Sequence, residues 1–202
     1  MFGWGKKKST YWEHLSDKPT IEVIQGDITV QTTDAVVNAA SKDLALGGTV
    51  DKAIKQGAGP ELVEALKVIG TCPTGSAIIT YGFKLPAKYI IHTAGPIYGQ
   101  EGGREADLLA SCYKSCLELA ETYQLHSIAF PSISTGIYGY PIKEAAEIAG
   151  YTTGRYFFDP SHAATSLQKI IFTLYAEDKF QAYQEVFQKV FQDSKSWFKY
   201  LT

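Results

Sequence analysis

The sequence predicts an α/β fold with a largely parallel sheet and helices on both of its faces. Two observations support this fold class. Apolar runs of strand length alternate with longer segments of helical periodicity, and the alternation continues along most of the chain. This pattern is typical of parallel strands joined by crossover helices. The chain has 202 residues, 45% of them hydrophobic, which is enough for one domain with a sizeable core.

The strands and helices are expected in a regular order. Strand-like runs are IEVI (21–24), AVVNAA (35–40), SAIITYG (76–82), YIIHTAG (89–95), SIAF (127–130) and KIIFTLYA (169–176). Helices are predicted over 50–56 and 61–69, from about 104 to 123, from about 142, and near the C-terminus. Apolar stripes of helical period in the third and last helices consist of Leu109, Cys112, Cys116, Leu117 and Ala120, and of Phe180, Tyr183, Phe187 and Val190.

Composition excludes several classes of protein. The net charge of −2 and the pI of about 6.1 argue against a sequence-independent nucleic-acid binder. No apolar run reaches about 18 residues, and MFGWGKKKST lacks a signal-peptide core, so we expect no membrane span and a cytoplasmic location. Cys72, Cys112 and Cys116 are expected as buried apolar side chains. We expect a monomer with one domain over 19–193 and extensions over 1–18 and 194–202.

Three loops rich in small residues follow predicted strands. They are GDIT (26–29), NAASKDLALGGTVD (38–51) and SISTGIYGYP (132–141). Ligands of open α/β sheets bind at the carboxyl ends of the strands, and small residues let a ligand approach backbone N–H groups. The P-loop motif and the dinucleotide-binding G-x-G-x-x-G motif are both absent. The loops therefore indicate that a diphosphate is held from two sides by backbone amides.

Six motifs, in order, resemble those of the macro domain family. They are GDIT, DAVVNAA, GGTVDKAI, TGSAIITYGFKLPAKYIIHTAGP, CYKSCLELA and SIAFPSISTGIYGYPIKEAAEIA. The similarity runs from about residue 21 to 190 and is greatest to the branch that hydrolyses ADP-ribose conjugates. The resemblance implies a three-layer α/β/α fold around a six-stranded mixed sheet. It also implies that ADP-ribose binds in a cleft at the strand ends.

The resemblance assigns roles to particular residues. Asp27 would accept a hydrogen bond from the adenine amino group, with Ile28 making a backbone contact beside it. Tyr175, or less favourably Phe172, would lie against the adenine. Asn38 would fix the first loop, and Asp51 matches the aspartate that hydrolytic members use near the distal ribose. The diphosphate and distal ribose would be lined by Gly47, Gly48, Thr49 and Val50, and by Ser134, Thr135, Gly136, Ile137 and Tyr138.

Each residue also has a structural alternative. Asp27 can cap a turn, and Asp51 can be a carboxylate that stabilises a helix N-terminus. Asn38 can be a satisfied structural amide. For the loop tyrosines we favour ligand contact for Tyr138 and a core position for Tyr140. His92 lies within an apolar strand, so a buried structural histidine is favoured over a catalytic one.

An ester substrate needs little chemistry from the protein. The leaving group is a carboxylate with a pKa of about 4, so neither a metal nor a redox cofactor is expected. Asp51, the substrate's diphosphate, or both would polarise the attacking water. Ser41 stands where hydrolytic members usually carry a second asparagine, and Leu46 and Thr49 stand at positions that are often glycine. Two functions therefore remain open: an ADP-ribosyl-ester hydrolase, or a module that binds ADP-ribose without turnover.

Overall fold

The computed structural model describes residues 9–12, 19–45, 47–158 and 165–192. The predicted strands and helices are all confirmed, with bounds that shift by one or two residues where they differ. The strands are β1 (Ser9–Trp12), β2 (Thr20–Gln25), β3 (Ala35–Ala40), β4 (Ala77–Tyr81), β5 (Tyr89–Ala94), β6 (Ser127–Phe130) and β7 (Lys169–Leu174). The helices are the 3-10 helix η1 (Ile28–Val30), α1 (Thr49–Ala58), α2 (Pro60–Ile69), α3 (Glu105–Thr122), α4 (Ile142–Phe158) and α5 (Glu177–Gln192).

The strands form one mixed sheet in the order β1-β2-β7-β6-β3-β5-β4. Strands β2, β7, β6, β3 and β5 run parallel to one another, and β4 is antiparallel to β5. The expected six-stranded mixed sheet is therefore confirmed within residues 19–193. Strand β1, from the predicted N-terminal extension, adds one antiparallel strand along the free edge of β2.

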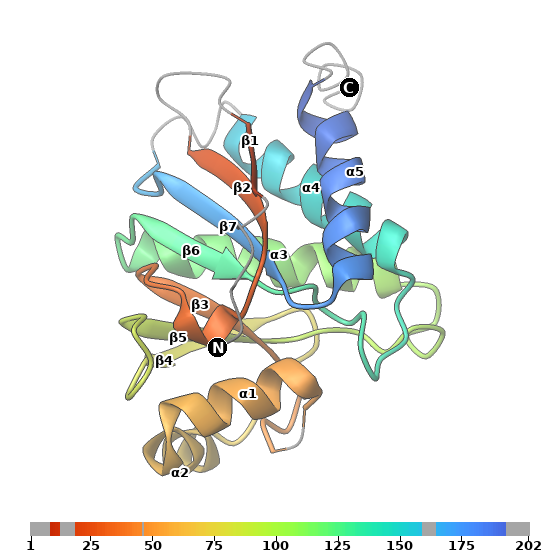
Figure 1. The fold of residues 1–202 in the computed structure, drawn as a ribbon. Helices are drawn as coiled ribbons and strands as arrows, with labels where there is room; N and C mark the ends of the chain where they lie inside the picture. The colour runs from red at the N-terminus through yellow and green to blue at the C-terminus, as the bar shows by residue number, and fades with distance from the viewer. Residues whose placement is uncertain (1–8, 13–18, 46, 159–164, 193–202) are drawn as a thin grey trace, which may run out of the picture.

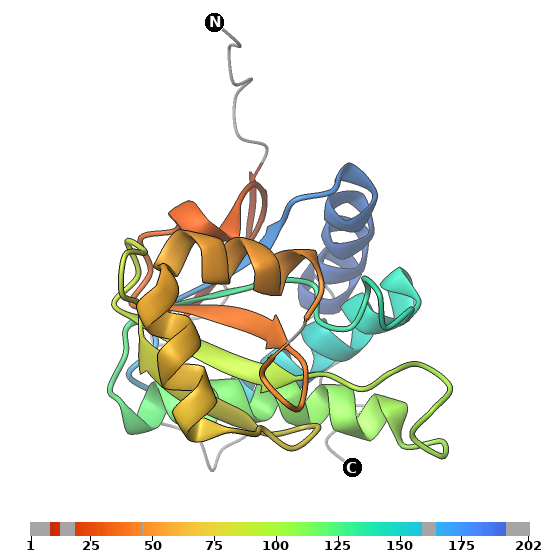
Figure 2. The ribbon, with the colours of Figure 1, turned by 90° about the horizontal axis from the view of Figure 1, so that it is seen from below.

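Helices cover both faces of this sheet and create two separate hydrophobic cores (Figure 1). Successive residues of a strand point to opposite faces, so Val36 belongs to the core under α1 and α2, whereas Val37 belongs to the core under α3, α4 and α5. Ile90 and Ile91 divide in the same way. Figure 2 shows α1 and α2 crossing one face of the sheet, as the three-layer prediction requires.

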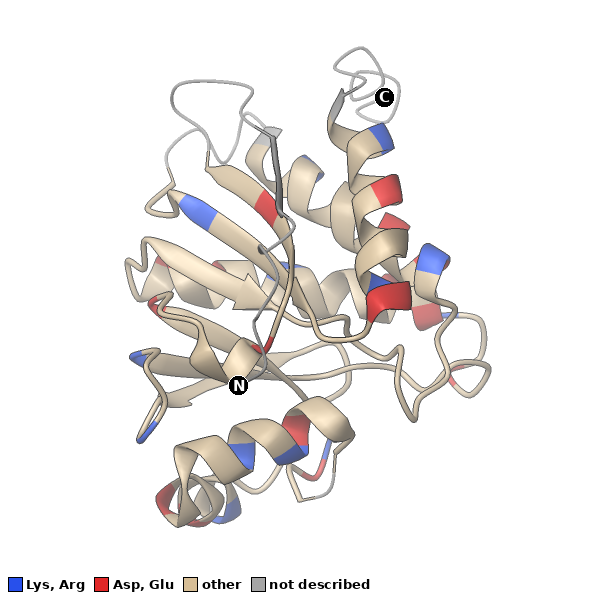
Figure 3. Ribbon diagram, in the orientation of Figure 1, with Lys and Arg blue, Asp and Glu red and all other residues tan. Residues whose placement is uncertain are grey.

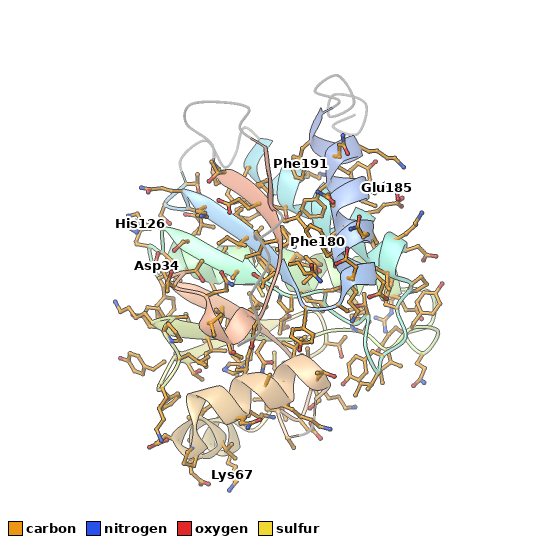
Figure 4. The ribbon with its side chains drawn as sticks, viewed as in Figure 1. Asp34, Lys67, His126, Phe180, Glu185 and Phe191 are labelled. Atoms are coloured by element: carbon orange, nitrogen blue, oxygen red, sulfur yellow. The ribbon has the colours of Figure 1, made fainter. Side chains whose placement is uncertain are left out.

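The larger core is rich in aromatic side chains, and α5 supplies many of them. Phe180 and Phe191 lie on the side of α5 that meets the sheet, whereas Glu185 projects away (Figure 4). The four predicted stripe residues of α5 are all buried. Cys72, Cys112 and Cys116 are buried free thiols, as predicted.

Charged residues lie mainly on the helices and loops, and acidic and basic positions alternate over the visible face (Figure 3). Two charges on neighbouring strands form an ion pair, with 2.7 Å between Lys169 Nζ and Glu22 Oε1. Within the described residues, no helix is both long and apolar enough to cross a lipid bilayer.

The two ends of the parallel strands have different roles. At the amino ends, Asp34 accepts hydrogen bonds from the backbone N–H groups of His126 and Ser127 and ties β3 to β6. Figure 4 shows Asp34 and His126 together at that end. At the carboxyl ends, the loops that follow β3, β5 and β6 converge on one cleft.

Candidate functional site

The cleft at the carboxyl ends of the strands encloses about 520 Å³ of empty space, part of it open to solvent. It is bounded by the ends of β3 and β5, by the first turn of α1, and by the loop after β6. Its lining consists of Ala39, Ala40, Gly47, Gly48, Thr49, Val50, Gly95, Ser132, Ile133, Ser134, Gly136, Ile137, Tyr138 and Lys179. Eight of the predicted ligand-binding residues are in this set; Asp27, Ile28, Asn38, Thr135 and Tyr175 are outside it.

One wall of the cleft is the N-terminus of α1. Gly48 is the N-cap residue and offers no side-chain hydrogen bond to the first turn. The N-terminal N–H groups of a helix lack intrahelical partners and carry the positive end of the helix dipole, which favours an anion. A Cβ atom on Gly48 would lie 3.7 Å from Ile137 Cγ1, so the two predicted loops face each other directly.

Asp51, in the first turn of α1, holds the first loop in place. Its side chain is only 1% exposed. Oδ1 accepts a hydrogen bond from Asn38 Nδ2 (2.8 Å), and Oδ2 accepts from the Gly47 N–H (3.0 Å) and from Lys55 Nζ (2.7 Å). A Cβ atom on Gly47 would lie 2.5 Å from Asp51 Cβ, so only glycine fits there. The carboxylate thus lies behind the loop and outside the cleft lining.

Lys55 completes this network. Its ammonium group has three donors, and they go to Asp51 Oδ2 and to the backbone carbonyls of Leu44 (2.8 Å) and Ala45 (2.9 Å). The side chain is 14% exposed. Sequence reasoning missed Lys55, although its spacing of four residues from Asp51 on a helix is the signal for such a pair.

Asn38 and His92 form the buried base of the site. Asn38 donates Nδ2 to Asp51 and to His92 Nδ1 (3.0 Å), so Nδ1 must be the unprotonated nitrogen of the ring. His92 Nε2–H then donates to Thr80 Oγ1 (2.9 Å). Burial, together with the Lys55 charge, lowers the pKa of His92 from 6.5 to about 3. The buried structural histidine predicted from the sequence is confirmed, and Asn38 Oδ1 has no hydrogen-bond partner among the described residues.

Hydrogen bonds between hydroxyl groups support the second loop. Thr135 Oγ1 donates to Ser132 Oγ (2.7 Å), which donates to the hydroxyl of Tyr183 on α5 (2.9 Å). Ser134 has a left-handed backbone (φ 64°), and its Oγ has no partner among the described residues. Gly95 packs directly against this loop, because a Cβ atom there would lie 2.2 Å from Ser134 Oγ. Thr135 therefore supports the loop and is not part of the lining.

The core position predicted for Tyr140 is confirmed. Tyr140 is buried and packs edge-to-face against Tyr98, with 4.9 Å between the ring centroids. Tyr138 is half-buried and lines the cleft. Burial, with the nearby charges of Asp43 and Asp51, raises its pKa. Ile137 is 72% exposed and lines the same cleft.

Asp27 and Tyr175 follow the paired strands β2 and β7. These strands pair in register up to Gln25 and Leu174, and the Gly26 N–H donates to the Leu174 carbonyl (3.0 Å), so both residues leave the sheet at the same end. Asp27 Oδ1 caps η1, accepting from the Thr29 N–H and hydroxyl (both 2.8 Å), whereas Oδ2 receives no hydrogen bond from the described residues. Tyr175 is 76% exposed. Ile28 is buried, and so is Phe172, which leaves Phe172 no surface to offer to an adenine.

Of the residues that depart from the family pattern, the structure describes Ser41 and Thr49. Ser41 is buried and donates its hydroxyl to Asp43 Oδ1 (2.5 Å), outside the cleft lining. Thr49 is exposed and lines the cleft. Leu46 lies outside the described residues.

Among the described residues of the lining, Lys179 is the one with a charged side chain. Sequence reasoning missed Lys179, and no local pattern marks it, because only the packing of α5 brings its first turn to the cleft. Within the described residues, no group of three or more histidine, cysteine, aspartate or glutamate side chains is arranged to hold a metal ion.

Comparisons of sequence and of structure with known proteins match this chain to the same family. Residues 37–149 match the family model of the Macro domain. A macro domain-containing protein of Chlorobaculum tepidum is 46% identical over 85% of this chain and 97% of its own length. A protein of Salmonella gallinarum named O-acetyl-ADP-ribose deacetylase is 53% identical over 64% of this chain and 74% of its own length.

Solved structures resemble the whole fold. A macrodomain of Oceanobacillus iheyensis, solved with ADP, superimposes with a TM-score of 0.85 at 41% identity, covering 93% of this chain and 99% of its own. A Trypanosoma brucei macrodomain in complex with ADP-ribose gives a TM-score of 0.74 at 37% identity, covering 82% of this chain and 68% of its own.

Proposed function

The chain belongs to the macro domain family, and from that premise we propose that its cleft binds ADP-ribose and that the protein hydrolyses ADP-ribosyl esters. The esters would join ADP-ribose to aspartate or glutamate side chains of a protein, or to acetate. The observation that carries the proposal is the pair of facing loops, in which the α1 N-terminus at Gly48 lies opposite Ile137 across a nearly neutral lining.

The orientation proposed for ADP-ribose follows from the protein groups that are available to bind each part of it. Asp27 Oδ2 accepts from the adenine amino group, and Tyr175 stacks on the ring. The diphosphate lies between the α1 N-terminus and the loop Ser134–Tyr138, where backbone N–H groups bind its oxygens. Tyr138 covers the distal ribose. The chemistry of each contact agrees with its residue type, since a carboxylate accepts from an amino group and rejects a keto group.

The same geometry suggests separate roles in hydrolysis for the protein side chains and for the bound diphosphate. A carboxylate leaving group departs without strong acid assistance, so the protein must hold the ester and admit one water. Asp51 acts as a positioning residue, because its oxygens are occupied by Asn38, Gly47 and Lys55. Asn38 Oδ1 is the unsatisfied acceptor of this network; it is buried and lies directly behind the cleft lining. The bound diphosphate polarises the attacking water.

A release assay tests the proposal. A substrate protein carrying glutamate-linked mono-ADP-ribose is incubated with the wild type and with Asp51→Ala, and free ADP-ribose is followed over time. Calorimetry measures ADP-ribose affinity in parallel. We expect release by the wild type and strongly reduced release by Asp51→Ala; release that is unchanged in Asp51→Ala removes this residue from the mechanism.

Binding without turnover is the second candidate. It is favoured by Ser41, because the serine side chain is shorter than the asparagine of hydrolytic members and because its hydroxyl donates to Asp43. Tight ADP-ribose binding by the wild type without release from either ester would establish this second function.

We also propose that the macro domain comprises residues 19–193 and that it acts as a cytoplasmic monomer. The three buried free thiols suit a reducing compartment. The flanking segments 1–18 and 194–202 would then be dispensable for binding. A chain that begins at residue 19 should keep its ADP-ribose affinity.

A further inference from the structure

Lys179 is the single cation among the described residues that line the cleft. It comes from the first turn of α5, immediately after β7, and it lines the same space as the first turn of α1 and the loop after β6. Because β7 lies between β2 and β6 in the sheet, this position is between the Asp27 end of the site and the second loop.

Lys179 forms no ion pair with any residue that the structure describes. Lys55, Lys67, Lys169 and Lys189 each have a carboxylate oxygen at 2.7 Å. Among the described residues, Lys179 has no carboxylate within the 4.0 Å that defines an ion pair. Burial lowers its pKa, and the charge of its neighbour Asp178 opposes that shift only in part.

A half-buried ammonium group without a partner is unfavourable unless a ligand compensates it. An anion held in this cleft would supply that compensation, because the same lining directs the N-terminus of α1 toward it. A phosphate oxygen is the chemical group that suits both donors, since it accepts charge-assisted hydrogen bonds from an ammonium and from backbone amides.

We propose that Lys179 is the charge partner of the ligand's diphosphate and that it gives the site its preference for phosphorylated ligands over the bare nucleoside. The inference rests on the proposed binding of ADP-ribose in this cleft. Backbone amides of the two loops fix the geometry of the diphosphate, and Lys179 compensates part of its negative charge from the α5 side.

Calorimetry with ADP and NMR titration with adenosine test this role. We expect Lys179→Gln to bind ADP about tenfold more weakly than the wild type, because a charge-assisted hydrogen bond is lost. Adenosine affinity should not change, because adenosine has no phosphate. Lys179→Arg should retain most of the ADP affinity. Lys189→Gln is the matched control: it removes an exposed lysine from the same helix and should bind ADP normally.

The outcomes separate this proposal from the proposed function. Equal ADP affinity in the wild type and Lys179→Gln would overturn the role of Lys179 while leaving ADP-ribose binding intact. A parallel loss of adenosine affinity would overturn it too, because the defect would then concern the shape of the cleft and not the phosphate charge. Failure of the wild type to bind ADP would defeat both proposals.

Discussion

Asn38 and Asp51 are joined by a hydrogen bond of 2.8 Å between Nδ2 and Oδ1, although one lies near the end of β3 and the other in the first turn of α1. The bond closes the first loop at its base, and the Gly47 N–H donates to the other oxygen of the same carboxylate. The sequence allowed Asp51 to be either a catalytic group or a helix N-terminal carboxylate. The geometry favours a third role, in which Asp51 sets the shape of the loop that faces the ligand.

Asp51→Ala should therefore lower stability as well as turnover. The change leaves the Gly47 N–H without an acceptor and removes one acceptor each from Lys55 Nζ and Asn38 Nδ2 in a buried network, which costs roughly 3 kcal/mol. Urea unfolding measures the loss. Glu61→Ala is the matched control, because Glu61 is also a first-turn carboxylate but is exposed on α2, so its loss should cost less than about 1 kcal/mol. Equal stability of both variants would contradict the role assigned to Asp51.

The sequence predicts the layers of this protein better than the details of its site. The strands could be located because residue pairs such as Val36–Val37 and Ile90–Ile91 are apolar on both faces, which is typical of a sheet buried on both sides. The helices could be located by their apolar stripes. The three small-residue loops were identified for the same reason, since a run of such residues after a strand is a local signal.

What could not be predicted depends on contacts between distant segments. Lys179 is 38 residues beyond the last of the three loops that the sequence linked to the cleft, and only the docking of α5 brings it to the site. The direction of the Asp51 carboxylate, behind the loop, also depends on Asn38 and Lys55 together. Strand β1 was not expected, because its pairing with β2 is invisible in a stretch of four residues.

Acid should weaken the fold through His92. Its pKa is about 3 in the folded protein and 6.5 ordinarily, so the neutral ring contributes full stability above pH 6.5, and this contribution is lost as the pH falls toward 3. Protonation would place an N–H on Nδ1, against the amide donor of Asn38. From pH 7 to pH 5 the loss from this residue should be about 2 kcal/mol.

Urea unfolding at pH 7 and pH 5 checks this value. His92→Gln removes the titrating ring, so its stability should change less between the two pH values than that of the wild type. Parallel changes in the two proteins would show that other groups cause the acid sensitivity.

Asp27→Asn should separate the two uses of this side chain. An asparagine Oδ1 can still cap η1, so stability should stay within about 0.5 kcal/mol of the wild type. The amide nitrogen that replaces Oδ2 is a donor and cannot accept from an adenine amino group, so ADP-ribose affinity should fall about tenfold. Calorimetry and thermal unfolding provide the two readouts. Unchanged affinity would mean that Asp27 serves only as a cap.

Gly95 directly follows β5 and packs against the second loop, so Gly95→Ala should disturb that loop. The new methyl group would lie 2.2 Å from Ser134 Oγ and 2.8 Å from Ile133 Cγ2, so the loop must move to accept it. Such overpacking costs about 1–3 kcal/mol, and displacement of the loop should weaken ADP-ribose binding. Gly136→Ala is the control within the same loop, because nothing lies within 4 Å of its Cβ position. Its unfolding midpoint should match that of the wild type. The difference in stability between the two alanine variants therefore measures how tightly the second loop packs against Gly95. Equal midpoints for the two variants would show that the loop yields freely and is not held by Gly95.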